Sequence, residues 1–310
     1  MNKRIMRDYL GYLISWLAMS FTVCICLGII IYLIINGISQ LSPDFILKAP
    51  APTSNEKMSG GISSPILGSL ILTLIGLVVA FPWSLITAMY LNEYAAKNKL
   101  ASVLRMGIEV LSGVPTIIIA IFALAVFTNP QFAFLSEMVP GSDKALGRSF
   151  LVSGITMAIM VLPYMIKTCE EALKNVPVNY REASLALGAS KLQTVLKVVL
   201  PASKDGLITA VTLGIGRIIG DTAIVWLTLG DTMKMGNSSG EWWMPSNIIN
   251  TLKGTGSTLT SFIFYASPAG EGNQTEKAFG AALVLIIIII IINLLTDFIG
   301  VFKRRMNDQQ

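Results

Sequence analysis

Histidine is absent from this 310-residue chain. Its absence excludes histidine acid–base chemistry, histidine metal ligation and Ser-His-Asp catalytic triads. Cysteine is nearly absent as well, and Cys24, Cys26 and Cys169 show neither a disulfide framework nor zinc-binding spacing. We interpret all three as small apolar residues that are buried.

Charged side chains are also scarce, at 13% of the chain, whereas soluble domains carry roughly a quarter. Hydrophobic residues make up 53%, and the mean hydropathy is +0.68. The composition therefore predicts an all-α, polytopic membrane protein. The sequence pI of about 9.1 is compatible with nucleic-acid binding. In a membrane chain, however, Lys and Arg more often lie in cytoplasmic loops, and we expect no nucleic-acid partner.

Six apolar runs have about the 20 residues that a helix needs to cross a bilayer. Lys3, Arg4 and Arg7 precede the first run, as they would in a signal peptide. That run is far longer than the roughly 7–15 apolar residues of such a peptide, so we expect an uncleaved anchor. The predicted spans are residues 11–36, 64–91, 106–128, 149–168, 206–229 and 278–302.

The distribution of Lys and Arg sets the predicted orientation. With a cytoplasmic N-terminus, 15 of the 23 fall in inner segments and seven in outer segments, so we expect both termini to be cytoplasmic. We divide the chain into residues 1–62, an anchor helix with the first outer loop, and residues 63–305, the main transmembrane domain. The second long outer loop, 230–277, could dock an extracytoplasmic protein.

The longest inner loop, residues 169–205, predicts two short helices. Asn179 with Glu182, and Ser190 with Gln193, have the spacing of helix N-caps and their third-position partners. Gly188 is expected to end the first helix and Pro201 the second. Such a helix–turn–helix can bind DNA. Because this loop is tethered between two spans, we favour docking of a cytoplasmic protein.

Four parts of this loop resemble the EAA loop of ABC-importer permeases, E-A-A-x3-G-x9-I-x-L-P: Glu182-Ala183-Ser184, Gly188, Val198 and Leu200-Pro201. Ser replaces the second Ala of the pattern, and Val replaces its Ile. The resemblance implies that the loop contains a coupling helix, which fits a groove of an ATPase subunit. The coupling residues that it implies are Glu182, Ala183, Gly188, Leu200 and Pro201.

Further segments resemble the permeases of the phosphate importer: "GGISSPILGS", "YLNEYA", "GVPTI", "LPYMIKTCEEAL", "GRIIGDT" and, more loosely, "KAFGAALVLI". The match is to PstA-like subunits, with the PstC-like partner permease as the alternative. It implies the fold of a type I ABC importer permease (MetI-like), with six transmembrane helices, in a prokaryotic cytoplasmic membrane. The chain would move inorganic phosphate and would itself catalyse no reaction.

The resemblance also implies partners in the bilayer and on both sides of it. They are a PstC-like permease, two PstB-like ATPase subunits and a PstS-like phosphate-binding protein. The ATPase would hold ATP and Mg, because this chain has no G-x4-G-K-[ST] sequence. "GSDKALGRS" (141–149) is superficially similar but has the wrong spacing and Arg in place of Lys. We expect no cofactor or metal in this chain.

Arg217 and Asp221 lie four residues apart in the fifth apolar run, on one face of a continuous helix. An arginine at bilayer depth costs about 2.5–3.5 kcal/mol, and such residues usually face a protein interior or a wet pathway. An ion pair that locks two helices is the alternative. Because a guanidinium matches an oxyanion with two parallel hydrogen bonds, we expect Arg217 to line the substrate pathway and Asp221 to balance its charge. The phosphate-permease resemblance places an Arg and an acidic residue, usually Glu, at these positions.

Lys167, at the inner end of the fourth run, is the third candidate pathway residue. The phosphate permeases that the chain resembles usually have Arg at this position. Lysine keeps the positive charge of arginine but cannot form two parallel hydrogen bonds. A positive-inside residue at a helix end is an equally good interpretation. Nearby, Arg105 and Glu109 have the spacing of an i,i+4 helix pair, and we expect Glu170 and Glu171 to cap or orient the inner loop.

Three rival functions remain open. A permease for another oxyanion, such as sulfate or molybdate, would use the same charges. A membrane enzyme is disfavoured because the spans contain no Ser/Lys or Asp/Asp constellation and the chain has no histidine. A secondary transporter is disfavoured because the sequence offers one set of intramembrane charges and no evident inverted repeat.

Overall fold

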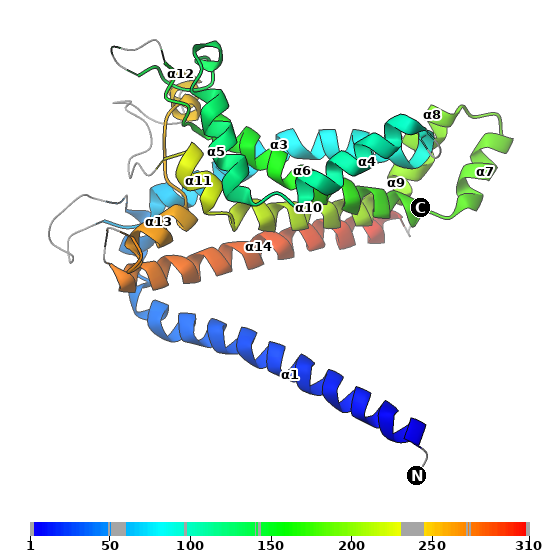
Figure 1. The fold of residues 1–310 in the computed structure, drawn as a ribbon, viewed down its shortest axis with the longest axis horizontal. Coiled ribbons are helices and arrows are strands. Elements are labelled where there is room, and N and C mark those ends of the chain that lie inside the picture. Colours follow the sequence, from blue (N-terminus) through cyan, green and yellow to red (C-terminus); the bar gives the residue numbers. More distant parts are fainter. Residues whose placement is uncertain are drawn as a thin grey trace.

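The computed structural model describes residues 3–48, 50, 60–95, 98–139, 141, 144–230, 245–270, 272 and 274–307. Regular structure in these ranges is helical, apart from one isolated antiparallel bridge between Met138 and Ala145. Figure 1 shows a long helical body from which one helix, α1, projects. Both chain ends lie at the same end of the molecule as the inner loop, which agrees with the predicted orientation (Figure 1).

Four helices are long and apolar enough to cross a membrane alone, and two bent helix pairs raise the number to six. The single helices are α1 (Lys3–Gly37), α3 (Ser63–Met89), α6 (Phe150–Lys174) and α14 (Thr275–Asn307). The first bent pair is α4 (Lys99–Ser112) with α5 (Thr116–Phe127). The second joins the inner loop to α10 (Lys204–Ile219). The prediction of an all-α bundle with six membrane segments is confirmed in this form.

The third predicted span, 106–128, is wrong as one straight helix. The axes of α4 and α5 differ by 103°, with Gly113, Val114 and Pro115 at the bend. Proline has no N–H to donate and disfavours helical backbone at the residue before it, so α4 cannot continue through Val114. The apolar run therefore changes direction in its middle.

The fifth predicted span, 206–229, is also two helices. α10 ends at Ile219, and α11 (Ala223–Thr228) starts after the three residues Gly220–Thr222. The Asp221 carboxylate accepts a hydrogen bond from the Ile224 backbone N–H at 2.8 Å. A short acidic side chain that binds the backbone in this way competes with a continuous helix and starts a new one.

The core of the body is the contact of α3, α6 and α10. Leu72, Met157 and Ile218, one from each helix, are at most 2% exposed. Gly154 of α6 faces α3 so closely that a Cβ there would overlap the Ile75 side chain. Small residues at such positions let two membrane helices approach each other.

Helix α1 packs against only a small part of the helical body. Its side chains from Tyr9 to Ile31 are exposed, including Cys24 and Cys26, so the predicted burial of these two cysteines is wrong, whereas Cys169 is buried. α1 meets α14 near its outer end, where the Tyr32 and Phe279 rings lie edge to face at 5.6 Å. Apolar side chains in a bilayer need no protein interior, because lipid tails are equally apolar.

Short helices close the outer end of the body. They are α2 (Pro43–Leu47), α11, α12 (Pro245–Lys253) and α13 (Leu259–Ala266). Within the predicted outer loop 230–277, residues 231–244, 271 and 273 lie outside the described residues. The described part packs back onto the body, and the Leu259 N–H donates to Ser69 Oγ of α3 at 2.9 Å.

Candidate functional site

A pocket of about 220 Å³ brings two of the three predicted pathway residues together. Arg217 reaches it from α10, and Lys167 reaches it from α6. The bend between α4 and α5 supplies polar groups from Ser112 and Thr116. We name this the Arg217 pocket; Leu111, Val114, Ile119, Met160, Pro163 and Tyr164 complete its lining.

The local sequence explains why the Arg217 pocket forms. The turn at Gly113–Pro115 points α5 away from α4, and Thr116 is the first residue of α5. Both Arg217 and Lys167 are exposed, and neither makes an ion pair within the part of the chain that the structure describes. The pocket therefore presents two cations and hydroxyl groups, an arrangement that suits an oxyanion.

Asp221 does not share a helix face with Arg217, and the predicted pairing of the two is wrong. Asp221 lies two residues beyond the end of α10, where its carboxylate accepts a hydrogen bond from the Ile224 N–H in the first turn of α11. Its backbone carbonyl accepts a hydrogen bond from Thr260 Oγ1 of α13 at 3.3 Å. Asp221 thus fixes the break between α10 and α11, and no ion pair with Arg217 occurs among the described residues.

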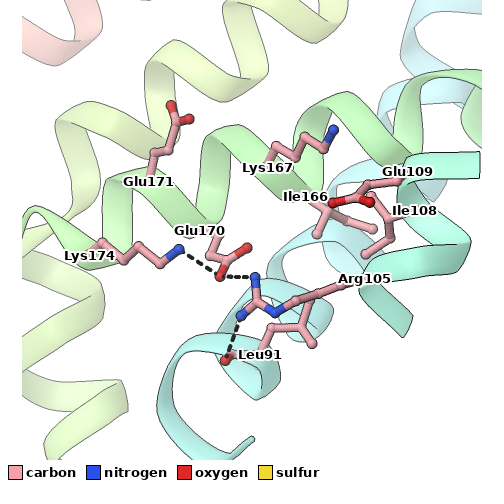
Figure 2. A pocket seen from close by; sticks show the side chains of 9 residues that line it. All are labelled: Leu91, Arg105, Ile108, Glu109, Ile166, Lys167, Glu170, Glu171 and Lys174. Atoms are coloured by element: carbon pink, nitrogen blue, oxygen red, sulfur yellow. Dashed lines mark hydrogen bonds and ion pairs between the residues drawn. The ribbon is translucent and has the colours of Figure 1, made fainter. Parts of the chain in front are cut away.

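A second pocket, of about 210 Å³, lies further inward and shares Lys167 with the first. Figure 2 shows the Arg105 and Lys174 side chains both directed at Glu170. The ion-pair distances to Glu170 Oε1 are 2.7 Å from Arg105 and 2.9 Å from Lys174. Arg105 Nη2 also donates to the Leu91 carbonyl at 3.3 Å. The predicted Arg105–Glu109 pair is therefore wrong, because a buried carboxylate on α6 competes for the guanidinium.

This inner pocket is balanced in charge, with three cations and three carboxylates in its lining, whereas the charged residues that line the Arg217 pocket are cations. Glu170 is 6% exposed and holds two cations in place. Lys167 points away from this cluster, and Glu171 also turns away from it (Figure 2). Lys167 thus lies at the boundary of the two pockets and makes no ion pair with a described residue, since Glu170 pairs with Arg105 and Lys174.

The inner loop forms a small helical hairpin at the cytoplasmic end. It consists of α7 (Val178–Ala186), α8 (Lys191–Thr194), the π turn η5 (Val195–Val199) and α9 (Leu200–Ala202). Gly188 ends the first helix with φ +82°, and Ser190 and Gln193 form the predicted capping box. The predicted N-cap Asn179 is wrong, because Pro177 precedes the helix and Asn179 lies inside it.

Most of the predicted coupling residues lie on the surface of this hairpin. Glu182, Ala183, Gly188 and Pro201 are exposed, and Leu200 is half-buried. Large apolar side chains are exposed beside them, with Leu187 at 89% and Val178 at 60%. Exposed apolar groups of this kind, rimmed by polar residues, are typical of a protein-docking surface.

Arg181 joins the hairpin to the membrane helices, and sequence reasoning missed it. Its guanidinium donates to Glu93 Oε1 from Nε at 3.1 Å and from Nη2 at 3.0 Å. It also donates to the carbonyls of Val176 at 2.6 Å and Leu173 at 2.8 Å, at the end of α6. Glu93 belongs to η3 (Tyr90–Tyr94), the π turn that continues α3. The 88 residues between Arg181 and Glu93 leave no local spacing from which to predict the pair.

Within the described ranges, no group of three or more Cys, Asp or Glu side chains is placed to hold a metal ion. The charged side chains that line the Arg217 pocket are Arg217 and Lys167, and neither makes an ion pair with a described residue.

Comparison with known proteins matches residues 80–307 to a family described as the inner membrane component of binding-protein-dependent transport systems. The chain is 31% identical over 306 residues to the probable ABC transporter permease protein YqgI of Bacillus subtilis, covering 97% of each chain. It is 28% identical over 254 residues to the phosphate transport system permease protein PstA 1 of Mycobacterium tuberculosis, covering 81% of this chain and 74% of that one.

Among solved structures, the fold is similar to that of a chain in a bacterial alginate ABC transporter, crystallised with its alginate pentasaccharide-bound periplasmic protein. The TM-score is 0.63 at 15% sequence identity, over 95% of this chain and 94% of that one. At this level of identity the similarity concerns the fold alone.

Proposed function

Because the chain belongs to the family of inner membrane components of binding-protein-dependent transport systems, the ABC importer permeases, we propose that it is the PstA-like permease of a phosphate importer. It would form the path for inorganic phosphate together with a PstC-like permease. Two PstB-like ATPase subunits would supply the energy, and a PstS-like protein would deliver the anion. We place the complex in the cytoplasmic membrane of a prokaryote.

The observation that carries the proposal is the Arg217 pocket. Two cations, Arg217 and Lys167, line it without a carboxylate among its described lining residues. A phosphate ion has to leave its hydration shell to cross the membrane, and a guanidinium can replace part of that shell with two parallel hydrogen bonds. The similarity to phosphate permeases supports phosphate over other oxyanions.

The exposed hairpin α7–α9 supports the proposed energy coupling. Its predicted docking residues face outward from the body, and its apolar side chains are available to a groove of an ATPase subunit. In our proposal, ATP-driven closure of the two ATPases moves this hairpin and rocks the membrane helices between inward-open and outward-open states.

Phosphate uptake by the complete complex in proteoliposomes tests the proposal. We expect uptake that requires internal ATP and is not inhibited by excess sulfate or molybdate. Arg217→Gln should lower the rate at least about tenfold, the effect of losing one charge-assisted contact, while Arg217→Lys should retain part of it. The matched control is Lys99→Gln, which removes an exposed inner cation outside the pocket.

Three outcomes would contradict the proposal. Uptake without ATP would exclude an ABC importer. Preferential uptake of sulfate or molybdate by the wild type would exclude phosphate as the substrate. Equal phosphate uptake by Arg217→Gln and Lys99→Gln, with normal assembly of both, would exclude the pathway role of Arg217.

A further inference from the structure

A third pocket, of about 450 Å³, lies at the outer end of the molecule and takes no part in the site described so far. We name it the Arg148 pocket. Its lining combines one arginine, three aromatic rings and a short loop after α13: Arg148, Trp226, Leu227, Phe264, Tyr265, Ala269 and Gly270. The Trp226 and Phe264 rings pack edge to face at 5.9 Å and form one wall.

The backbone at Arg148 is held firmly. The next residue, Ser149, is the N-cap of α6, and its N–H donates to the Thr228 carbonyl of α11 at 2.9 Å. Ser149 Oγ donates to the Leu135 carbonyl at 2.7 Å. Arg148 itself is half-buried and makes no ion pair or hydrogen bond with any residue in the described ranges. A fixed backbone thus presents a guanidinium whose donors have no partner among the described residues.

The Arg148 pocket adjoins the first turn of α5 through a neighbouring pocket. It shares Trp226 and Phe264 with an apolar pocket of about 500 Å³, whose lining includes Ile117 of α5. The residue before Ile117, Thr116, lines the Arg217 pocket. Neighbouring residues of α5 therefore line the apolar pocket and the Arg217 pocket, and the apolar pocket shares two aromatic rings with the Arg148 pocket.

All charged side chains among the described lining residues of these three pockets have the same sign. They are Arg148 in the outer pocket and Lys167 and Arg217 in the inner one. The acidic residues of the pocket in Figure 2 lie beyond Lys167, further inward. A surface that carries only cations at both ends of an apolar section attracts anions and repels cations.

We propose that the Arg148 pocket is an outer binding site for an inorganic oxyanion, where phosphate enters the path before it reaches Arg217. This inference rests on the proposed function. Arg148 supplies parallel N–H donors to the anion, and Tyr265 adds a phenolic hydroxyl at the same pocket. Trp226 and Phe264 form an apolar wall on one side of the pocket, and a contact between an anion and a guanidinium is stronger beside apolar groups than in open water.

The first test measures phosphate uptake by the complete complex in proteoliposomes with its binding protein. Arg148→Gln should lower the maximal uptake rate about tenfold, Arg148→Lys should retain part of it, and ATP hydrolysis without substrate should stay at the wild-type rate. The control is Lys48→Gln at the same end of the molecule, because Lys48 is an exposed cation that pairs with Asp44. Equal uptake by Arg148→Gln and Lys48→Gln would overturn the inference while leaving the importer itself intact.

The second test needs no transport. In a background with Cys24, Cys26 and Cys169 replaced by alanine, an Ala269→Cys variant of the complex in nanodiscs reports the charge of the pocket. A negatively charged methanethiosulfonate reagent should label Ala269→Cys faster than a positively charged one, and Arg148→Gln should reduce this ratio about tenfold. Inorganic phosphate should slow the labelling when Arg148 is present.

The ligand could otherwise be the phosphate group of an acidic lipid. Nanodiscs with and without phosphatidylglycerol separate the two sources. Protection by inorganic phosphate in both kinds of nanodisc supports the inference. Protection that requires phosphatidylglycerol and does not respond to inorganic phosphate would overturn it, as would a labelling ratio that is unchanged by Arg148→Gln.

Discussion

Glu170 determines which cations around the inner pocket are held in ion pairs. Glu170 forms ion pairs with both Arg105 and Lys174, and these pairs hold the two cations against α6. Lys167 lies only three residues earlier on α6 and has no such partner among the described residues. One buried carboxylate therefore separates a structural cluster from a pocket that carries net positive charge.

Glu170→Gln should destabilise the complex. The variant leaves Arg105 and Lys174 without their counter-charge, but these side chains are 42% and 54% exposed, so water screens them. We expect a loss of about 1–2 kcal/mol, read as a lower midpoint of thermal unfolding of the purified complex. Glu171→Gln, at the next and exposed position, is the control and should unfold like the wild type. Equal losses for both variants would refute the structural role of Glu170.

Gly188 is the residue for which backbone geometry alone predicts the effect of a substitution. Its φ is +82°, and a Cβ there would meet no atom within 4 Å, so only backbone strain opposes a side chain. Gly188→Ala should cost about 1–2 kcal/mol in the hairpin and weaken ATPase binding, whereas Gly188→Asn should be milder, because Asn tolerates this conformation. The amount of ATPase that co-purifies with each variant measures the two effects. A smaller loss of ATPase from Gly188→Ala than from Gly188→Asn would contradict the prediction.

At the scale of elements, the hairpin α7–α9 is fastened to the membrane helices from both of its arms. Arg181 of α7 joins Glu93 and the end of α6, while the Lys191 ammonium of α8 lies 5.0 Å from the centre of the Tyr94 ring. Ser184 and Thr194 hydrogen-bond to each other between the arms at 2.9 Å. A displacement of the hairpin therefore passes to α3 and α6 together.

Arg181→Met should uncouple ATP hydrolysis from transport. The variant keeps much of the apolar stem but removes the donors to Glu93, Val176 and Leu173, so the hairpin can move without α3 and α6. We expect phosphate uptake per ATP hydrolysed to fall at least about threefold.

The control for Arg181 is Lys197→Met in the same hairpin, because Lys197 is exposed. A Glu93→Gln variant should show a defect of the same kind, and the double variant should be little worse than Arg181→Met alone, since Arg181→Met already removes the Arg181–Glu93 interaction. Additive losses in the double variant would show that the two residues act separately.

The contact between α3 and α6 depends on the absence of a side chain at Gly154. Gly154→Val should force the helices apart and destabilise the complex by about 1–3 kcal/mol. The same change at Gly107 of α4, where a Cβ would meet no atom within 4 Å, should cost less. Thermal unfolding of the two variants compares them, and similar midpoints would contradict the close contact that we describe.

At the scale of the whole molecule, the sequence predicts the number and order of the membrane segments, because each is a long apolar run. It also predicts the turn at Gly188 and the capping box at Ser190, because both depend on residues that are close together in the sequence. It does not predict that two runs are broken: hydropathy alone does not register Pro115 as a bend, or Asp221 as a helix cap rather than a partner of Arg217. Nor does it predict the pairs Arg105–Glu170 and Arg181–Glu93, which join residues far apart in the chain.

The apolar pocket between the two cationic ones has an electrical consequence. Ile117, Ala223 and Phe264 line it, and its described lining contains no charged side chain. An anion in this section would have no positively charged side chain beside it. Moving one elementary charge across a membrane also changes its free energy by about 2.3 kcal/mol per 100 mV of membrane potential. In the path that we propose, this section would insulate the two sides of the membrane from each other, so that a transporter at rest would pass no anion current.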